Sequence, residues 1–148
     1  MPAIDVVSDA SIALKWFHAE GEEELEPARD LLAAHQSRTI ALSVLDLTAY
    51  EVGNALLRGQ AKANADQVAT VLDALAEICL AVRPDAAELR VAAELAARHD
   101  LTLYDAAYAA VAESRNATLV TLDQALLDAG LGTRPSELAP RLDHPHGD

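Results

Sequence analysis

The sequence predicts an α/β fold in which a mostly parallel sheet carries helices on both faces. Short β-branched or apolar runs alternate along the chain with longer segments whose apolar residues recur at helical spacing. This alternation is typical of parallel sheets, because parallel neighbours are joined by helical crossovers that cover the sheet. With 148 residues, 51% of them hydrophobic, the chain is long enough to bury one such core.

In the first half of the chain, two predicted strands each lead into helices. The β-branched run at 4–8 is followed by a helix over 10–17. A second helix over 22–36 has acids in its first turns, where they suit the positive end of the helix dipole. The run TIALS at 39–43 is the next strand, and the helix after it spans 44–59 and ends at a glycine.

The second half continues the alternation. A helix with an asparagine cap leads to a strand that contains the single cysteine, and the next helix starts with proline. An alanine-rich helix, a short apolar strand and a short helix closed by glycine follow. In order, these six elements span residues 64–78, 79–83, 84–100, 104–115, 118–122 and 123–129.

One domain is expected over residues 1–135. Residues 136–148 are polar and rich in proline, which predicts a loose tail. No uncharged stretch reaches the ~20 residues needed to cross a bilayer, and no signal peptide is visible. Cys79 stands alone, so it cannot form an internal disulfide. These features predict a cytoplasmic protein with no membrane contact.

The net charge of −13 argues against generic binding to nucleic acid. A phosphate backbone is held mainly by Lys and Arg, and this chain has only eleven of them against twenty-four acids. The acidic balance is compatible with a basic partner or with cations held by carboxylates.

Four acids stand out by their position. Asp9 and Asp123 directly follow predicted strands, and Asp105 opens the alanine-rich helix. Sites in open parallel sheets form outside the carboxyl ends of the strands, so these three acids are expected at one edge. Glu51 differs because it lies in the middle of the helix predicted over 44–59, on the flank of its apolar arc. A half-buried carboxylate there needs a cation or hydrogen-bond donors.

Each acid also has a purely structural interpretation. Asp9 and Asp123 could simply cap the helices that follow them, since Asp is a preferred N-cap. Glu51 could pair with Arg58, although a spacing of seven residues is too long for a simple helical pair. The coincidence of four acids favours one shared site. Because this site has no His or Cys, it suits Mg²⁺ or Mn²⁺ and phosphoryl chemistry.

These residues also carry a family resemblance. The matching stretches are VVSDASIALKWF with Asp9 and Ser11, YEVGNALLRG with Glu51 and Asn54, LTLYDAAYAAVAES with Asp105, and ATLVTLDQAL with Thr121 and Asp123. In order, spacing and length they resemble the PIN-domain ribonucleases, most closely the VapC toxins of bacterial VapBC toxin–antitoxin pairs. The resemblance implies a PIN-like three-layer α/β/α sandwich and a metal-dependent endoribonuclease. It also implies a homodimer and a VapB-like antitoxin whose C-terminal segment binds near the active site.

The resemblance also implies roles for individual residues. Asp9 and Asp105 would be the principal ligands of Mg²⁺, with Mn²⁺ as a substitute, and Glu51 and Asp123 would complete the acidic cluster. Asp128, one turn beyond Asp123, is a weaker candidate. A nearby hydroxyl would orient a carboxylate or a water, and the two candidates are Ser11 and Thr121.

Three other interpretations stay open. A phosphatase or phosphotransferase with Asp9 as nucleophile would want a second acid two residues on, where Ser11 stands. It would also want a late lysine, as would a receiver-like switch module, but the only lysines are Lys15 and Lys62. The third is a catalytically silent PIN-fold protein that only binds partners. Nuclease activity in Mg²⁺ that is lost in EDTA would separate the nuclease from all three.

Trp16, seven residues after Asp9, has two possible roles. It could offer its ring as a stacking platform for an RNA base. A place in the core or in a dimer interface is favoured, because aromatic side chains dominate such surfaces.

Overall fold

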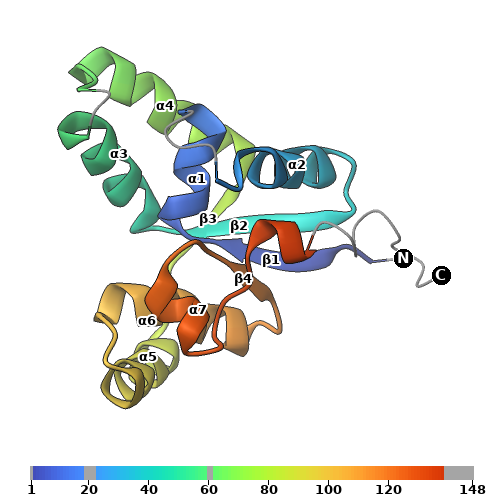
Figure 1. The fold of residues 1–148 in the computed structure, drawn as a ribbon, viewed down its shortest axis with the longest axis vertical. Coiled ribbons are helices and arrows are strands. Elements are labelled where there is room, and N and C mark those ends of the chain that lie inside the picture. The colour runs from blue at the N-terminus through green and yellow to red at the C-terminus, as the bar shows by residue number, and fades with distance from the viewer. Residues whose placement is uncertain (1, 19–22, 60–61, 139–148) are drawn as a thin grey trace.

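The computed structural model describes residues 2–18, 23–59 and 62–138 (Figure 1). Its centre is a four-stranded sheet in the order β3-β2-β1-β4, and every strand pair in it is parallel. The parallel sheet predicted from the sequence is confirmed. Its strands are β1 (Ile4–Ser8), β2 (Ile40–Leu45), β3 (Leu80–Val82) and β4 (Thr118–Val120).

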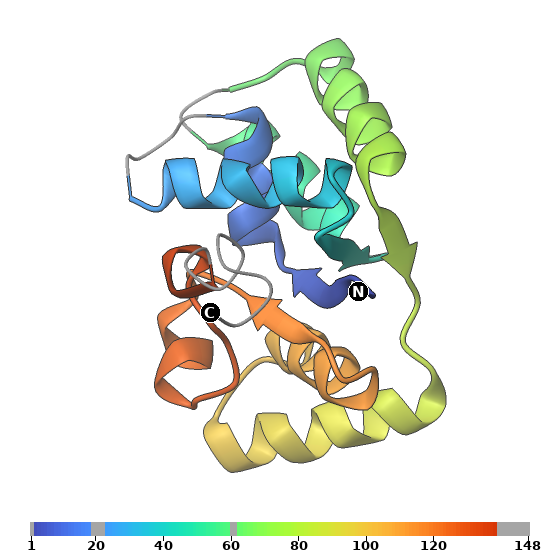
Figure 2. The ribbon, with the colours of Figure 1, turned by 90° about the vertical axis from the view of Figure 1, so that its right-hand side faces the viewer.

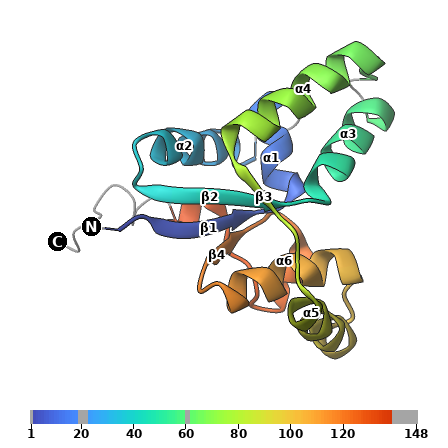
Figure 3. The ribbon, with the colours of Figure 1, turned by 180° about the vertical axis from the view of Figure 1, so that it is seen from behind.

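Helices cover both faces of the sheet, which gives the expected three-layer α/β/α sandwich (Figures 1 and 3). One layer holds α1 (Ala10–Phe17), α2 (Leu25–Gln36), α3 (Thr48–Arg58) and α4 (Ala65–Ile78). The other layer holds α5 (Ala86–His99), α6 (Leu103–Ser114) and α7 (Gln124–Asp128). Within the described residues, no helix is both long and apolar enough to cross a membrane.

Each helical layer has its own apolar core. Val6 on β1 belongs to the cluster under α1–α4, and its neighbour Val7 belongs to the cluster over α5 and α6. This split follows from strand geometry, because successive side chains point to opposite faces of a sheet. The central strand is therefore buried on both sides, as in other parallel sheets.

The helix predicted over 44–59 begins later than expected. Val44 and Leu45 extend β2, and α3 starts only at Thr48. Val44 is buried in one core cluster and Leu45 in the other, which is the environment of a central strand. The shorter helix moves Glu51 from the middle of the helix to its first turn.

Trp16 packs in the core. Its ring is buried between α1 and α2, and its Nε1 donates a hydrogen bond of 2.9 Å to the carbonyl of Ala28. The alternative of an exposed stacking platform is therefore wrong for this residue.

The ordered fold extends at least to Leu138, beyond the expected domain end at residue 135. Residues 135–138 are helical, and Leu138 is buried in the same cluster as Trp16. Figure 2 shows this segment, in red, beside the layer that contains α1 and α2. The rest of the expected tail, 139–148, lies outside the described residues.

Candidate active site

The four acids singled out in the sequence meet at the carboxyl edge of the sheet. Asp9 directly follows β1, and Asp123 comes three residues after the end of the neighbouring β4. Glu51 and Asp105 lie in the first turns of α3 and α6. Their negative charges repel one another. The charge of Asp105 raises the pKa of Glu51, and the charges of Asp123 and Asp9 raise the pKa of Asp105. The structure therefore places all four acids at one edge of the sheet, where their charges interact.

Asp9 is the most deeply buried acid of the site, with 5% of its surface exposed. Its Oδ1 accepts a 2.6 Å hydrogen bond from the Ser11 hydroxyl, and its Oδ2 accepts one from the Thr121 hydroxyl. Oδ1 also accepts from the backbone N–H of Ile12, so Asp9 caps α1. Burial raises the pKa of Asp9 to about 6, although these hydrogen bonds lower it and the charge of Glu51 raises it slightly further.

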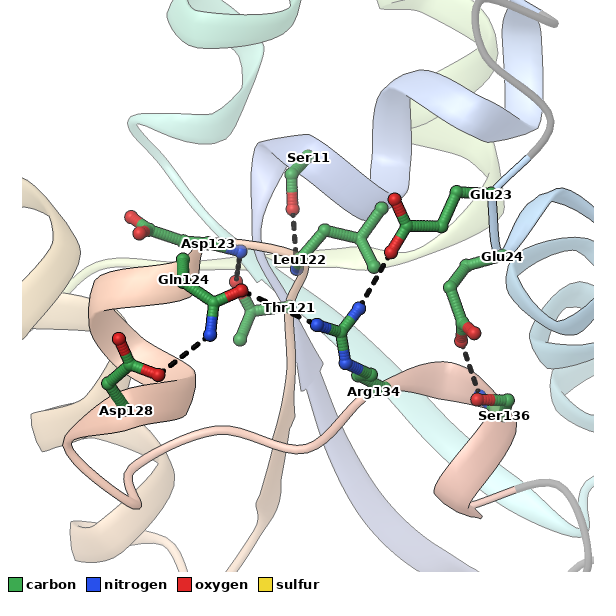
Figure 4. Close-up of polar contacts among 10 residues, drawn as sticks. All are labelled: Ser11, Glu23, Glu24, Thr121, Leu122, Asp123, Gln124, Asp128, Arg134 and Ser136. Carbon is green, nitrogen blue, oxygen red and sulfur yellow. Dashed lines mark hydrogen bonds and ion pairs between the residues drawn. The ribbon is translucent and has the colours of Figure 1, made fainter.

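The two hydroxyls that hold Asp9 are themselves held by the backbone after β4 (Figure 4). The N–H of Leu122 donates to Ser11 Oγ at 3.0 Å, and the N–H of Asp123 donates to Thr121 Oγ1 at 2.9 Å. Ser11 and Thr121 each accept one hydrogen bond and donate the other to Asp9. The Asp9 carboxylate is thus fixed in direction from two sides.

A side chain of α6 fixes the position of Glu51. The Tyr108 hydroxyl donates a 2.7 Å hydrogen bond to Glu51 Oε1. The Tyr108 oxygen lies 2.6 Å from Thr48 Oγ1, which accepts from the backbone N–H of Leu45 at 3.1 Å. Burial raises the pKa of Glu51, the Tyr108 hydrogen bond lowers it, and the charge of Asp105 raises it.

Among the acids of the site, Asp123 has the largest effect on Asp105. Burial raises the pKa of Asp105 to about 6, and a hydrogen bond and charge repulsion from Asp123 raise it too. Thr102, rather than Asp105, caps α6, because its hydroxyl accepts from the Asp105 N–H at 3.1 Å. Asp123 also caps α7 through the N–H of Ala125. Capping and membership of the acidic group therefore coexist at Asp9 and Asp123.

Asp128 does not join this group. Its side chain is exposed and accepts a 2.7 Å hydrogen bond from the Gln124 amide, one turn earlier on α7 (Figure 4). It is absent from the charges that act on Asp9, Glu51 and Asp105. The weaker candidate of the sequence is thus an exposed helical acid.

The carboxylates suit a divalent cation that prefers oxygen ligands. In the part of the chain that the structure describes, none of the four forms an ion pair with Lys or Arg, and no three His, Cys, Asp or Glu side chains converge into a ready-made metal cluster. Mg²⁺ does not require such a group, since it usually takes one or two carboxylates and keeps several waters. A cation would also offset the repulsion that raises the pKa of Asp105.

The segment at 132–136, which follows α7, contacts the site next to β4 (Figure 4). The Arg134 guanidinium donates to Glu23 at 2.8 Å and lies 3.5 Å from the Gln124 amide oxygen. Two residues later, the N–H of Ser136 donates to the Glu24 carboxylate at 2.8 Å. These contacts tie the segment after α7 to the start of α2.

The segment at 132–136 also packs against Thr121. The N–H of Thr121 donates to the carbonyl of Thr133 at 3.0 Å, which continues the pairing of β4. Gly132 passes so close to Thr121 that a Cβ at this position would overlap the threonine methyl group. A glycine is therefore required for the segment to approach the hydroxyl that holds Asp9.

Sequence reasoning named the hydroxyls of Ser11 and Thr121, but it missed three further neutral residues of the site. Thr102 could have been found from Thr-Leu-Tyr-Asp at 102–105, which matches the pattern of a threonine cap followed by an acid three residues later. Tyr108 offers a weaker signal: it interrupts a run of alanines, and a buried tyrosine needs a partner for its hydroxyl. Thr48 offers none, because its partner lies sixty residues away in the chain.

The fold and this edge of acids are those of a PIN domain. The family model of the PIN domain matches residues 6–130, a span that contains all four acids. The chain therefore belongs to the PIN-domain family.

Relatives and a solved structure support this assignment. The chain is 35% identical over 127 residues to Ribonuclease VapC3 of Pyrobaculum aerophilum, covering 83% of this chain and 92% of that one. It is 40% identical over 104 residues to Exonuclease VapC9 of the same organism, covering 65% and 75%. The crystal structure of PAE2754, also from Pyrobaculum aerophilum, superposes with a TM-score of 0.68 at 27% identity, over 95% of this chain and 96% of that one.

Proposed function

We propose that the protein is the toxin of a VapBC-type toxin–antitoxin pair, a metal-dependent endoribonuclease that hydrolyses RNA phosphodiester bonds. The observation that carries this proposal is the meeting of Asp9, Glu51, Asp105 and Asp123 at one edge of a PIN-type sheet. The similarity to Ribonuclease VapC3 over most of both chains supports it. Such an enzyme would act in the cytoplasm, where its RNA is.

In this proposal Asp9 and Asp105 would hold Mg²⁺, with Mn²⁺ as a substitute, and Glu51 and Asp123 would lie beside it. Such an ion neutralises charge on a phosphate and lowers the pKa of a water so that it can attack. The protein supplies rigidity. Asp9 is held by two hydroxyls, Glu51 is held by Tyr108, and neither carboxylate must be reoriented when RNA arrives.

The chemistry of the site predicts the ends of the cleaved RNA. Attack by water should leave a 5′-phosphate and a 3′-hydroxyl. Attack by the RNA's own 2′-hydroxyl would leave a cyclic phosphate and typically needs His or Lys as acid and base. Among the described residues, neither type contributes a hydrogen bond to the four acids.

The test is cleavage of bulk tRNA and rRNA in Mg²⁺, in EDTA, and by Asp9→Asn. We expect cleavage in Mg²⁺ only, a fall of more than about 100-fold in the variant, and 5′-phosphate ends. A circular RNA separates the two activities that the relatives' names suggest, because only an endonuclease can open it. Undiminished cleavage in EDTA or a 2′,3′-cyclic phosphate would overturn the mechanism. Wild-type protein that cleaves no RNA would favour a silent PIN-fold binding protein.

A VapB-like antitoxin and a homodimer complete the proposal. The acidic chain suits a partner with a basic, apolar C-terminal segment. The neighbouring reading frame is the direct observation: a short upstream gene with a DNA-binding N-terminus and such a C-terminus would support the pair. Co-expression should then yield a complex whose RNA cleavage is suppressed. Light scattering on the free protein tests the dimer.

A further inference from the structure

Two exposed tyrosines flank the acidic edge. The chain has one Trp, one Phe and three Tyr. Three of these aromatic side chains pack into the interior: Trp16, Phe17 and Tyr108. The other two are Tyr50, with 81% of its surface exposed, and Tyr104, with 66%. Each directly precedes an acid of the candidate active site, Glu51 in one case and Asp105 in the other.

The two rings stand on opposite helical layers. Tyr104 lies one turn before Tyr108 on α6, and residues four apart share a helix face. Tyr104 lies in the first turn of α6, one turn nearer the carboxyl edge than Tyr108, whose hydroxyl reaches Glu51. Tyr50 lies in the first turn of α3, on the other side of the sheet (Figure 1). The first turns of α3 and α6, which carry these two rings, also carry Glu51 and Asp105.

The negative charge of the acidic edge explains why aromatic contacts with RNA matter there. The four acids repel a polyanion, and the chain as a whole carries a charge of −13. Stacking of a base on an aromatic ring needs no charge, tolerates any base, and contributes roughly 5- to 150-fold in affinity per base. It is therefore a form of RNA binding that this acidic surface can support.

Resting on the proposed nuclease function, we propose that Tyr50 and Tyr104 are base-stacking residues that hold single-stranded RNA on either side of the scissile phosphate. A protein partner would contact Tyr50 without contacting Tyr104. Tyr50 also lines a groove of about 580 Å³ between α3 and α4, with Leu57, Val68 and Leu72. An apolar segment seated in that groove would contact Tyr50 without Tyr104. RNA binding that depends on both rings therefore distinguishes base stacking from the docking of a protein partner.

The experiment uses the full-length protein and the RNA whose cleavage site has been mapped. A 12-nucleotide single strand spanning the cut carries 2-aminopurine on either side of it, and binding is followed in the Asp9→Asn background. We expect Tyr50→Leu and Tyr104→Leu each to weaken binding at least fivefold and to abolish the fluorescence quenching of one 2-aminopurine. Tyr50→Phe and Tyr104→Phe keep the ring and should retain the quenching. Leu89→Ala, which alters an exposed residue of α5, is the matched control.

In the active protein, the leucine variants should raise KM at least fivefold with kcat within about twofold. Melting curves verify that they fold, and light scattering follows their oligomeric state. Unchanged affinity and quenching in both leucine variants would overturn the proposal. So would loss of the dimer or of antitoxin binding with RNA affinity intact, since that result assigns the tyrosines to a protein interface. If the wild type cleaves no RNA, the proposed function itself fails before any tyrosine is changed.

Discussion

The Tyr108 hydroxyl donates a 2.7 Å hydrogen bond to Oε1 of Glu51 and so joins α6 to α3 beneath the candidate active site. The same hydroxyl lies 2.6 Å from Thr48 Oγ1, which accepts from the backbone at the end of β2. Glu51 is therefore aligned by a chain of hydrogen bonds that begins in the sheet. Its direction depends on two helices that meet only in the folded protein.

Tyr108→Phe should lower RNA cleavage about tenfold or more. Hydrogen bonds to charged groups contribute about 1.5–3 kcal/mol, and without this one Glu51 is free to turn toward solvent. The fold should persist with a modestly lower melting temperature, because the buried ring remains. Thr70→Val is the control, since it removes an exposed hydroxyl from α4, far from the site. Equal activity of Tyr108→Phe and the wild type would show that Glu51 needs no alignment.

The stability of the metal-free protein should fall as Asp9 ionises. Burial raises the pKa of Asp9 from 3.8 to about 6. A carboxyl whose pKa is higher in the folded state contributes stability below its unfolded pKa and loses it as the pH rises through the folded pKa. The loss therefore falls between about pH 4 and pH 6, and its size is of the order of 3 kcal/mol.

Urea unfolding of the wild type and of Asp9→Asn, in EDTA from pH 4 to 8, measures this contribution together with the relief of Asp105 from the Asp9 charge, which has the same sign. The variant should gain stability relative to the wild type across that window, and the gain should level off above pH 7. Glu88, whose pKa the Arg115 hydrogen bond lowers, titrates with the opposite sign, but it does so in both proteins and cancels. A difference that does not vary with pH would contradict a raised pKa at Asp9.

Much of this site can be predicted from local patterns. Asp9 and Asp123 follow strands that are recognisable as short apolar runs, and the edge of a parallel sheet then brings them together. Glu51 is identified by its place on an amphipathic helix, although the sequence predicts that this helix begins at residue 44 and in the structure it begins at Thr48. Val44 and Leu45 caused the error, because an apolar run buried on both sides shows neither strand nor helix periodicity.

The contacts of Tyr108 and Thr48 could not be predicted, because they join distant parts of the chain. Tyr108 and Glu51 are 57 residues apart, and Tyr108 and Thr48 are 60 apart. Nothing local to a threonine or tyrosine says which carboxylate it will meet. The burial of Leu138 is also a long-range contact, since its cluster is built from the sheet and from α1–α4, all earlier in the chain.

Bound Mg²⁺ should raise the melting temperature. At a hundredfold excess over its Kd, a ligand of the folded state contributes about 2.7 kcal/mol, which is roughly 5 to 10 °C for a domain of this size. Asp105→Asn should reduce this shift and raise the melting temperature in EDTA, because it relieves repulsion with Asp123 and Asp9. Asp128→Asn, an exposed acid outside the group, should do neither. The shared site fails if neither Mg²⁺ nor Mn²⁺ shifts the wild type.

Gly132→Ala should damage the site through Thr121. The new methyl group would overlap the Thr121 methyl, so Thr121 or the segment beside β4 must shift, and the hydroxyl that holds Asp9 moves with it. Losses at such supporting contacts are typically 10- to 100-fold in activity or metal affinity. Gly53→Ala is the control, because its Cβ would meet Val68 at an ordinary 3.5 Å.

The double variant Gly132→Ala with Thr121→Ser tests this cause directly. Serine removes the methyl group that the alanine would strike and keeps the hydroxyl that donates to Asp9. Activity and Mg²⁺ affinity should therefore recover toward those of Thr121→Ser alone, measured by RNA cleavage and by the melting shift. If the double variant is as impaired as Gly132→Ala, the glycine acts through the backbone of its own segment, and the link from residue 132 to Asp9 is broken.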